Sequence, residues 1–219
     1  MKRSFLISIF LVFVMTPAVI QAKEKVLLGN VNFAVKLDYI TFTDDFFGQI
    51  GDENTGYIGL EGSGKISPNV YLGGEIGTST VSSDVGFDII EALLSLEHDV
   101  INADFTFFEL NVKYAKDLSR YFVIDLGGGL SCNKASVDFE THDWVLVDEV
   151  NTHTITNSRN ETDWLFGGQI FADLAFKFHW FSTGINGKYQ LTEDFKDSRS
   201  GYEFPLNNWR LGMQLGVIF

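Results

Sequence analysis

The sequence predicts an all-β protein, an eight-stranded antiparallel up-and-down transmembrane β-barrel. Segments of roughly ten residues alternate between apolar and small or polar side chains, and this pattern recurs eight times. The connections between segments are short and long in turn. A helical membrane protein is excluded because no uncharged run of 18 residues follows residue 22. Disorder is excluded because 15% of the residues are aromatic.

The N-terminus carries the pattern of an export signal. Basic Lys2 and Arg3 precede an apolar run over residues 4–15, and the small residue Ala22 fits the cleavage site of a signal peptidase. We therefore predict a signal peptide over residues 1–22, removed on export, and a barrel domain over residues 23–219. No cysteine lies at the cleavage point, which argues against a lipoprotein.

In each predicted strand the apolar residues lie on one face and the polar or small residues on the other. The alternation alone does not say which face is inside, so a soluble lipocalin-type barrel or a sandwich is an alternative. Glycine and charges of both signs on the polar face favour a narrow, polar lumen. We therefore expect Val35, Leu110 and Leu215 to point outward, and Lys113 and Asp173 to point inward.

Aromatic residues collect at the ends of the segments, which is typical of the two girdles of a membrane barrel. One predicted girdle comprises Tyr39, Phe42, Trp164, Tyr189 and Trp209. The other comprises Tyr114, Phe122, Phe178, Trp180 and Phe219.

The connections predict which end of the barrel faces which compartment. The short ones cover residues 67–69, 116–120 and 179–182, and the long ones cover approximately residues 41–56, 79–102, 133–163 and 192–208. This layout predicts four long extracellular loops and three short periplasmic turns. In the second long connection, residues 88–97 have the spacing of a short amphipathic helix. The third contains β-branched runs, which are compatible with two strands that continue beyond the membrane.

The inward face of the predicted barrel carries as many basic as acidic side chains. An eight-stranded barrel is just wide enough for its side chains to fill it, and buried charges need partners. We therefore predict an ion-pair network in the lumen. Its members are Lys36, Asp38, Glu61, Lys65, Glu75, Glu109, Lys113, Asp125, Asp173, Lys177, Lys188 and Arg210.

Turn geometry predicts some of these pairs. If residues 180–181 form a two-residue turn, Asp173 lies opposite Lys188 on the neighbouring strand. The short connection over residues 116–120 places Lys113 diagonal to Asp125 on the next strand, within cross-strand reach.

A tight turn at residues 67–69 predicts that Glu61 lies directly opposite Glu75, where the two carboxylates repel each other. A cation must reach them across the lumen, and the candidates are Lys36, Lys113 and Lys177. Two hypotheses follow for the network: a gated ion path that opens when one pair breaks, or a plugged, structural interior. The plugged interior is favoured.

The whole predicted mature chain resembles small bacterial outer-membrane barrels of the OmpA transmembrane-domain and OmpX type. The resemblance rests on the export signal, the eight alternating segments, the four long connections and a last strand that ends in Phe219. It implies insertion in the bacterial outer membrane, with Leu215, Val217 and Phe219 as the signal read by the barrel-assembly machinery. No periplasmic peptidoglycan-binding domain is expected after Phe219.

Composition narrows the function further. A net charge of -13 argues against binding nucleic acid, because no basic stripe is available for phosphates. A single cysteine, Cys132, excludes a disulfide framework and a multi-cysteine metal site. Acidic long connections repel anionic lipopolysaccharide unless Ca²⁺ or Mg²⁺ bridges them, but no spacing matches an EF-hand. No cofactor is expected.

The sequence therefore predicts a non-enzymatic outer-membrane scaffold that displays acidic loops for adhesion or envelope contacts. Its expected partners are outer-membrane lipids, lipopolysaccharide, the assembly machinery and an unidentified extracellular partner, and a monomer is the expected state for this barrel size. One alternative is a narrow pore or an OmpW-like conduit for small hydrophobic molecules. That conduit needs an apolar upper lumen, whereas the predicted inward positions are polar or glycine.

A third hypothesis is a lipid A-modifying enzyme that uses serine, histidine and an acid near the outer leaflet. His142 and His153 lie in the third long connection, with Ser158 nearby in sequence. A general base must lie within hydrogen-bond reach of its nucleophile, and this spacing does not provide that geometry. No catalytic residue is predicted.

Overall fold

The protein is described by a computed structural model over residues 30–43, 54–83, 98–147, 150–196 and 203–219. The predicted signal peptide and the predicted helix over residues 88–97 lie outside these residues. The strands are β1 (Val31–Phe42), β2 (Asn54–Ser67), β3 (Val70–Ser83), β4 (His98–Asp117), β5 (Phe122–Val147), β6 (Val150–Phe178), β7 (Phe181–Thr192), β8 (Asp194–Lys196), β9 (Glu203–Pro205) and β10 (Asn208–Ile218). Within the described residues, no helix is long and apolar enough to cross a membrane.

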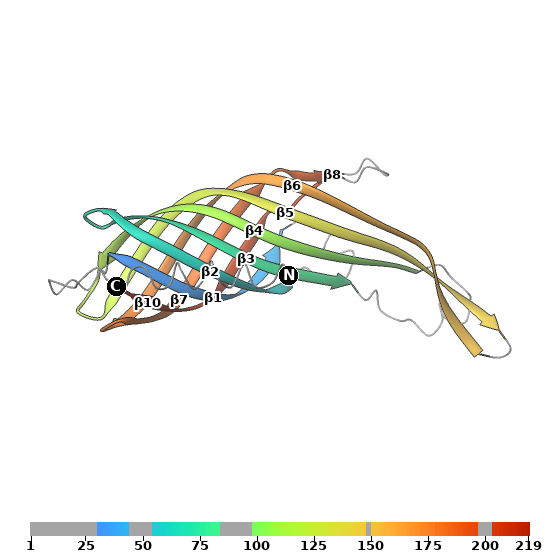
Figure 1. Cartoon of the computed structure of the whole chain (residues 1–219), viewed down its shortest axis with the longest axis horizontal. Helices are drawn as coiled ribbons and strands as arrows, with labels where there is room; N and C mark the ends of the chain where they lie inside the picture. The colour runs from blue at the N-terminus through green and yellow to red at the C-terminus, as the bar shows by residue number, and fades with distance from the viewer. Residues whose placement is uncertain (1–29, 44–53, 84–97, 148–149, 197–202) are drawn as a thin grey trace, which may run out of the picture.

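Eight of these strands form one closed antiparallel barrel in the order β1-β10-β7-β6-β5-β4-β3-β2 (Figure 1). The first and last barrel strands close it, with Val35 directly opposite Leu215. The amide of Phe219 donates to the carbonyl of Val31 at 2.9 Å, and the carbonyl of Phe219 accepts from the amide of Asn30 at 2.7 Å. The predicted fold class is confirmed.

Three tight connections lie at one end of the barrel, which we call the turn end. They join β2 to β3, β4 to β5 and β6 to β7. Asn69 and His179 adopt positive φ angles of 63° and 55° there, a conformation that few residues other than glycine adopt. The β6–β7 turn consists of His179 and Trp180, because Phe178 pairs with Phe181.

The prediction that Asp173 lies opposite Lys188 is therefore wrong. Asp173 pairs with Asn186, and Lys188 pairs with Phe171. The registers differ by two residues, so every side chain keeps its predicted face even though its neighbour changes.

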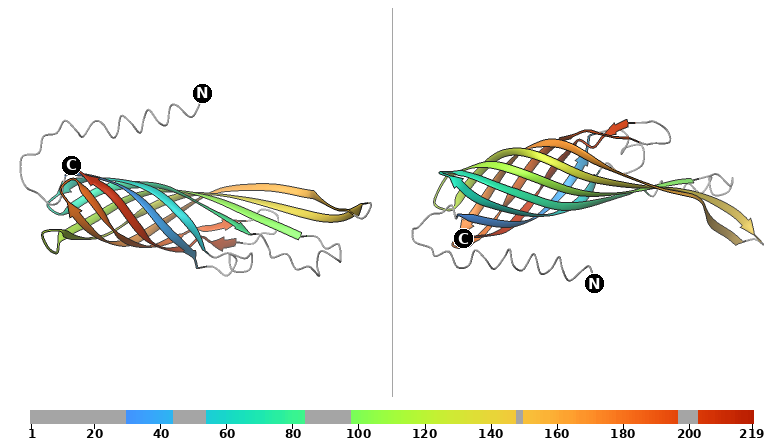
Figure 2. Two further views of the ribbon diagram at one scale, coloured as in Figure 1. Left: turned by 90° about the horizontal axis from the view of Figure 1, so that it is seen from below. Right: turned by 45° about the horizontal axis from the view of Figure 1, so that its top comes forward.

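The opposite end, which we call the hairpin end, is dominated by β5 and β6. These strands have 26 and 29 residues and pair with each other as far as Val147 and Val150, well beyond the other strands, with one register shift between Thr141 and His142 (Figures 1 and 2). The third long connection is therefore mostly a protruding hairpin. The fourth contains a small two-stranded sheet, in which Phe195 of β8 pairs with Phe204 of β9.

The apolar face of the barrel points outward. Val35, Leu110 and Leu215 are 39%, 56% and 51% exposed, whereas Lys113 and Asp173 are 6% and 2% exposed. A soluble barrel has the reverse arrangement, so the lipocalin-type alternative is wrong.

Exposed aromatic residues mark both ends of this apolar surface, with one correction. Tyr39, Trp164 and Trp209 are exposed near the hairpin end, and the ring centroids of Tyr189 and Trp209 lie 4.3 Å apart. Phe42, which was predicted to join this girdle, is buried inside the barrel instead. The girdle residues predicted at the turn end, Tyr114, Phe122, Phe178, Trp180 and Phe219, are all exposed.

Candidate functional site: the filled lumen

The lower lumen, nearer the turn end, is built around two opposed carboxylates. Glu61 of β2 and Glu75 of β3 are directly opposite each other. Lys36 of β1 bridges them, with its Nζ 2.7 Å from Glu61 Oε2 and 3.0 Å from Glu75 Oε2. Lys113 of β4 binds the other oxygen of Glu61 and lies 3.8 Å from Asp125 Oδ2. The repulsion between the two glutamates is thus offset by two ammonium groups.

The ion-pair chain continues toward the hairpin end. Lys188 of β7 lies 2.9 Å from Glu75 Oε2 and 2.5 Å from Glu109 Oε2. Arg210 of β10 donates from Nη1 to Glu109 Oε1 at 2.9 Å. Tyr57 donates its hydroxyl to Glu75 Oε1 at 2.5 Å. All of these side chains are buried, so the chain of charges crosses the lumen from wall to wall.

Arg210 links the ionic part of the lumen to an apolar part. Its Nη2 donates to Gln190 Oε1 at 2.6 Å and its Nε donates to Asn208 Oδ1 at 3.2 Å. The guanidinium carbon lies 4.1 Å from the ring centroid of Phe107 and 4.6 Å from that of Tyr57. This placement satisfies the charge on one side and stacks it on aromatic rings on the other.

An apolar cluster fills the lumen beyond Arg210. Its rings are in contact, with centroids of Phe42 and Phe105 5.2 Å apart and those of Tyr57 and Phe107 5.6 Å apart. Its members, all at most 3% exposed, are Ile40, Phe42, Tyr57, Val81, Ala103, Phe105, Phe107, Ala135, Val137, Leu165, Phe195 and Leu206. The prediction that inward positions are polar or glycine is wrong at this end of the barrel.

Glycines make room for the central tyrosine. A Cβ added to Gly77 would lie 2.2 Å from the hydroxyl oxygen of Tyr57, and one added to Gly59 would lie 2.6 Å from it. The tyrosine ring therefore lies flat across two strands, where its hydroxyl reaches Glu75. This explains part of the glycine content of the inward face.

The remaining predicted lumen residues do not join the chain of ion pairs. Asp38 is buried and accepts a hydrogen bond from Asn186 Nδ2 at 2.8 Å. Lys65 is half-buried near the turn end, and Lys177 is buried beside the turn-end opening. In the part of the chain that the structure describes, neither lysine has an ion pair within 4 Å, so Lys177 does not bridge the two glutamates.

The predicted assembly residues and the lone cysteine lie on the wall. Leu215 and Phe219 are exposed on the outer face, and Val217 is half-buried. Cys132 is a free thiol between the buried residues Ser131 and Asn133, so it lies on the outward face of β5.

The histidines of the enzyme hypothesis lie along the protruding hairpin. His142 of β5 is the register partner of His98 of β4, and His153 is the partner of Trp144. Ser158 is opposite Glu140 and so faces neither histidine in register. Over the described ranges, no group of three or more histidine, cysteine, aspartate or glutamate side chains is placed to hold a metal ion.

A closed eight-stranded antiparallel barrel with an apolar exterior and a charged interior is the fold of small outer-membrane barrels. The structure of Neisserial surface protein A, from Neisseria, matches with a TM-score of 0.54 at 10% sequence identity, over 86% of this chain and 96% of that chain. The structure of Ail, the attachment invasion locus protein of Yersinia pestis, matches with a TM-score of 0.44 at 13% identity, over 86% and 99%. The N-terminal barrel domain of Pseudomonas aeruginosa OprF matches with a TM-score of 0.40 at 13% identity, over 87% and 99%.

At such low identities the similarity to the Neisserial protein shows a common fold alone. No protein-family model matches the chain. No curated protein matches it in sequence.

Proposed function

We propose that this chain is a non-enzymatic outer-membrane barrel with a plugged lumen, whose protruding hairpin makes contacts outside the cell. The filled lumen is the observation that carries this proposal. The ion-pair chain closes the middle of the barrel, and the apolar cluster closes the hairpin end. Because a filled lumen leaves no path for solutes, we expect the function to depend on the outer surface and the protruding hairpin.

The outer surface supports insertion in a bilayer. Leu130, Ile170 and Leu211 are 70%, 67% and 69% exposed, and contiguous apolar surface of this kind is costly in water. A closed barrel satisfies its backbone hydrogen bonds internally, which hydrocarbon requires. In the usual orientation the turn end would face the periplasm and the hairpin end the cell exterior.

The polar outward face of β5 and β6 supports the proposal that the hairpin end of the barrel lies in water. On this face, Asn160 Nδ2 donates to Asp138 Oδ1 at 2.5 Å, and the hydroxyls of Ser136 and Thr162 lie 3.2 Å apart. The pairing of β6 with β7 begins at Gly167, so residues 150–165 of β6 pair with β5 alone in the described structure. Beyond the last register pair of β4 and β5, His98 with His142, the described parts of strands β5 and β6 pair only with each other, so this outer part of the hairpin stands clear of the barrel wall.

The role of the hairpin can be tested by shortening it without changing its register. Thr141 pairs with Asn157, so residues 142–156 can be replaced by Asn-Gly, which favours a two-residue hairpin turn. Bacteria that display either protein are compared for attachment to an epithelial cell layer, with surface amount and heat-modifiable gel mobility as controls for folding. The shortened protein should fold equally well and attach several-fold less. Equal attachment, or attachment by neither, contradicts the adhesive role.

A second candidate function, an OmpW-like conduit for small hydrophobic molecules, is favoured by the apolar cluster at the hairpin end. A molecule could enter only if the aromatic side chains separated. Transfer of a hydrophobic fluorescent dye into vesicles that contain the protein tests this candidate. Faster transfer than into protein-free vesicles would support the conduit and oppose the plugged scaffold.

A further inference from the structure

Two pairs of directly opposed carboxylates lie in the lower lumen, and only one of the two pairs is bridged by a lysine. Glu61 and Glu75 are bridged by Lys36. Asp125 of β5 and Asp173 of β6 are also direct register partners. Neither carboxylate oxygen of Asp173 has a hydrogen-bond partner, and no lysine or arginine of the described chain lies within 4 Å of it.

A third oxygen donor flanks the aspartate pair. Asn186 of β7 is the register partner of Asp173 on its other side. Its amide nitrogen donates to Asp38 at 2.8 Å, which leaves its carbonyl oxygen available, and that oxygen has no partner. Directly opposed side chains on neighbouring strands have Cβ atoms about 5 Å apart. Asp125, Asp173 and Asn186 thus form a cross-strand row with unpartnered, inward oxygens, and each residue is at least nine-tenths buried.

The charge balance of the lumen indicates what this row holds. The buried acids are Asp38, Glu61, Glu75, Glu109, Asp125 and Asp173. The buried bases are Lys36, Lys113, Lys177, Lys188 and Arg210. Among the buried side chains of the described residues, which exclude half-buried Lys65 at the turn end, there is therefore one more acid than base, and an uncompensated buried charge is strongly destabilising. One added positive charge makes the interior neutral, whereas a divalent ion would overshoot.

We propose that the Asp125–Asp173–Asn186 row binds one monovalent alkali cation, Na⁺ or K⁺. An all-oxygen set of carboxylates and an amide carbonyl is the ligand chemistry that hard cations prefer. The ion takes the role at this aspartate pair that Lys36 takes at the glutamate pair. It acts as a structural counter-ion that completes the plugged interior.

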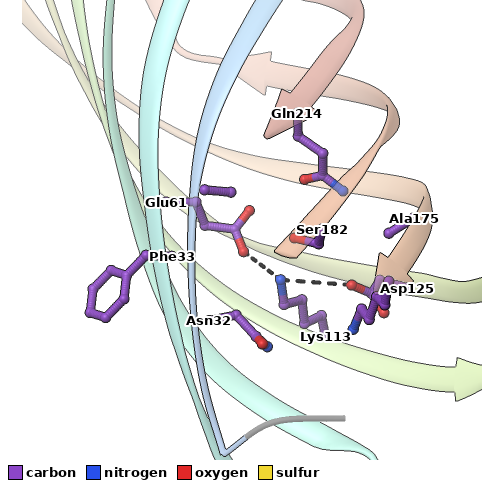
Figure 3. Close-up of a pocket in the computed structure, with 10 residues that line it drawn as sticks. Asn32, Phe33, Glu61, Lys113, Asp125, Ala175, Ser182 and Gln214 are labelled. Atoms are coloured by element: carbon purple, nitrogen blue, oxygen red, sulfur yellow. Dashed lines mark hydrogen bonds and ion pairs between the residues drawn. The ribbon is translucent and has the colours of Figure 1, made fainter. Parts of the chain in front are cut away.

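A cavity near the turn end reaches one member of the row. This polar cavity of about 20 Å³ is lined by Glu61, Lys113, Asp125 and Lys177, among others, whereas Asp173 and Asn186 do not line it. Figure 3 shows Lys113 between Glu61 and Asp125 at this cavity, with its contact to Asp125 on one carboxylate oxygen. The other oxygen, Oδ1, has no partner. Because the apolar cluster closes the hairpin end, the cation enters from the turn end.

Urea unfolding of the full mature protein in detergent micelles tests the site. Midpoints are compared in NaCl, KCl and choline chloride at equal ionic strength, because choline is too large for the row. The wild type should be more stable in at least one of the two alkali salts than in choline chloride. Asp173→Asn should lose this difference, and Asp104→Asn, a change at an exposed residue of β4, should keep it. The KCl arm shows which of the two alkali ions fits the row better, and equal midpoints in all three salts would contradict the site.

Crystals soaked in thallium(I), an anomalous scatterer that replaces alkali ions, give a second readout that does not depend on the stability of a variant. A peak between Asp125 and Asp173 is expected. No peak together with equal midpoints in all three salts overturns the proposal. A midpoint that rises toward acid pH without any dependence on Na⁺ or K⁺ also overturns it, because the two aspartates then share a proton instead.

Discussion

Strand β4 crosses two different environments, and its side chains show where one ends and the other begins. Near the middle of the strand, Leu110 points outward and is exposed, while its neighbours Glu109 and Lys113 point inward and are buried. Nearer the hairpin end, Phe105 points inward and is buried, while Asp104 points outward and is exposed. Within a few residues of β4, the outward face changes from apolar to polar and the inward face changes from polar to apolar.

The exchange is not confined to β4. On β3, Val81 is buried inside while Thr80 is exposed outside, and on β5 Ala135 is buried inside while Lys134 is exposed outside. The exposed ring of Trp164 lies near this level, 5.9 Å from that of Phe108. Below the aromatic rings the barrel is built like a membrane protein, with its polar groups enclosed. Above them it is built like a soluble barrel, with an apolar core and a polar surface.

The boundary inside the lumen is formed by Arg210, and its loss should have the largest effect. Arg210→Met leaves Glu109 with one cation instead of two and removes the guanidinium from Phe107 and Tyr57. Removing one partner of a buried ion pair costs about 3–5 kcal/mol. Urea unfolding in lipid vesicles, followed by tryptophan fluorescence, should show a loss of this size.

Lys65→Met is the control for this change, because it removes a half-buried lysine that has no ion pair within the described residues. Its loss of stability should be much smaller. Equal losses for the two variants would mean that the ion-pair chain contributes nothing specific.

Arginine substitutions on the outer face of β4 test where the apolar outer surface ends. Leu110→Arg puts a charge on the apolar surface and should cost about 2–4 kcal/mol in a bilayer. Asp104→Arg makes the corresponding change on the same face of the same strand, beyond the exchange. It removes the hydrogen bond from the Thr80 hydroxyl at 2.7 Å and should cost about 0.5–1.5 kcal/mol. The two unfolding free energies are measured in the same vesicles. Similar costs at both positions would refute the exchange of environments.

The smallest predicted effect concerns the tyrosine that contacts both parts of the lumen. Gly77→Ala places a methyl group against the Tyr57 ring and displaces its hydroxyl from Glu75, which should cost about 1–3 kcal/mol. Gly56→Ala is the matched control, since an added Cβ there meets nothing within 4 Å. The free energies of unfolding of the two variants should differ, and a neutral Gly77→Ala would show that Tyr57 has room to move.

The alternation of the sequence was sufficient to predict the fold and most of the wall. A period of two assigns each residue to a face whatever the exact register, so Val35, Leu110 and Lys113 were placed correctly. The placement of Glu61 opposite Glu75, and of Lys113 diagonal to Asp125, also holds. These pairs depend only on tight turns that the sequence makes visible.

The errors have physical causes. The rule that inward residues are polar fails most extensively beyond the aromatic rings, so the apolar cluster was missed, although Phe105 and Phe107 share the parity of Glu109 in the sequence. A smaller buried cluster of Tyr71, Ala115 and Val123 breaks the rule near the turn end as well. The pairing of Asp173 was wrong because the turn consists of His179 and Trp180, with His179 at a positive φ angle, rather than of residues 180–181. Of the three lysines predicted as candidates to bridge Glu61 and Glu75, Lys36 contacts both glutamates, whereas Lys177 contacts neither, because side-chain reach inside the closed barrel selects among them.

The filled lumen can be tested directly by electrical recording. Purified protein inserted in a planar lipid bilayer should produce no channel steps above the baseline, because the ion-pair chain and the apolar cluster both close the barrel. A steady, large conductance from the pure protein would contradict the filled lumen.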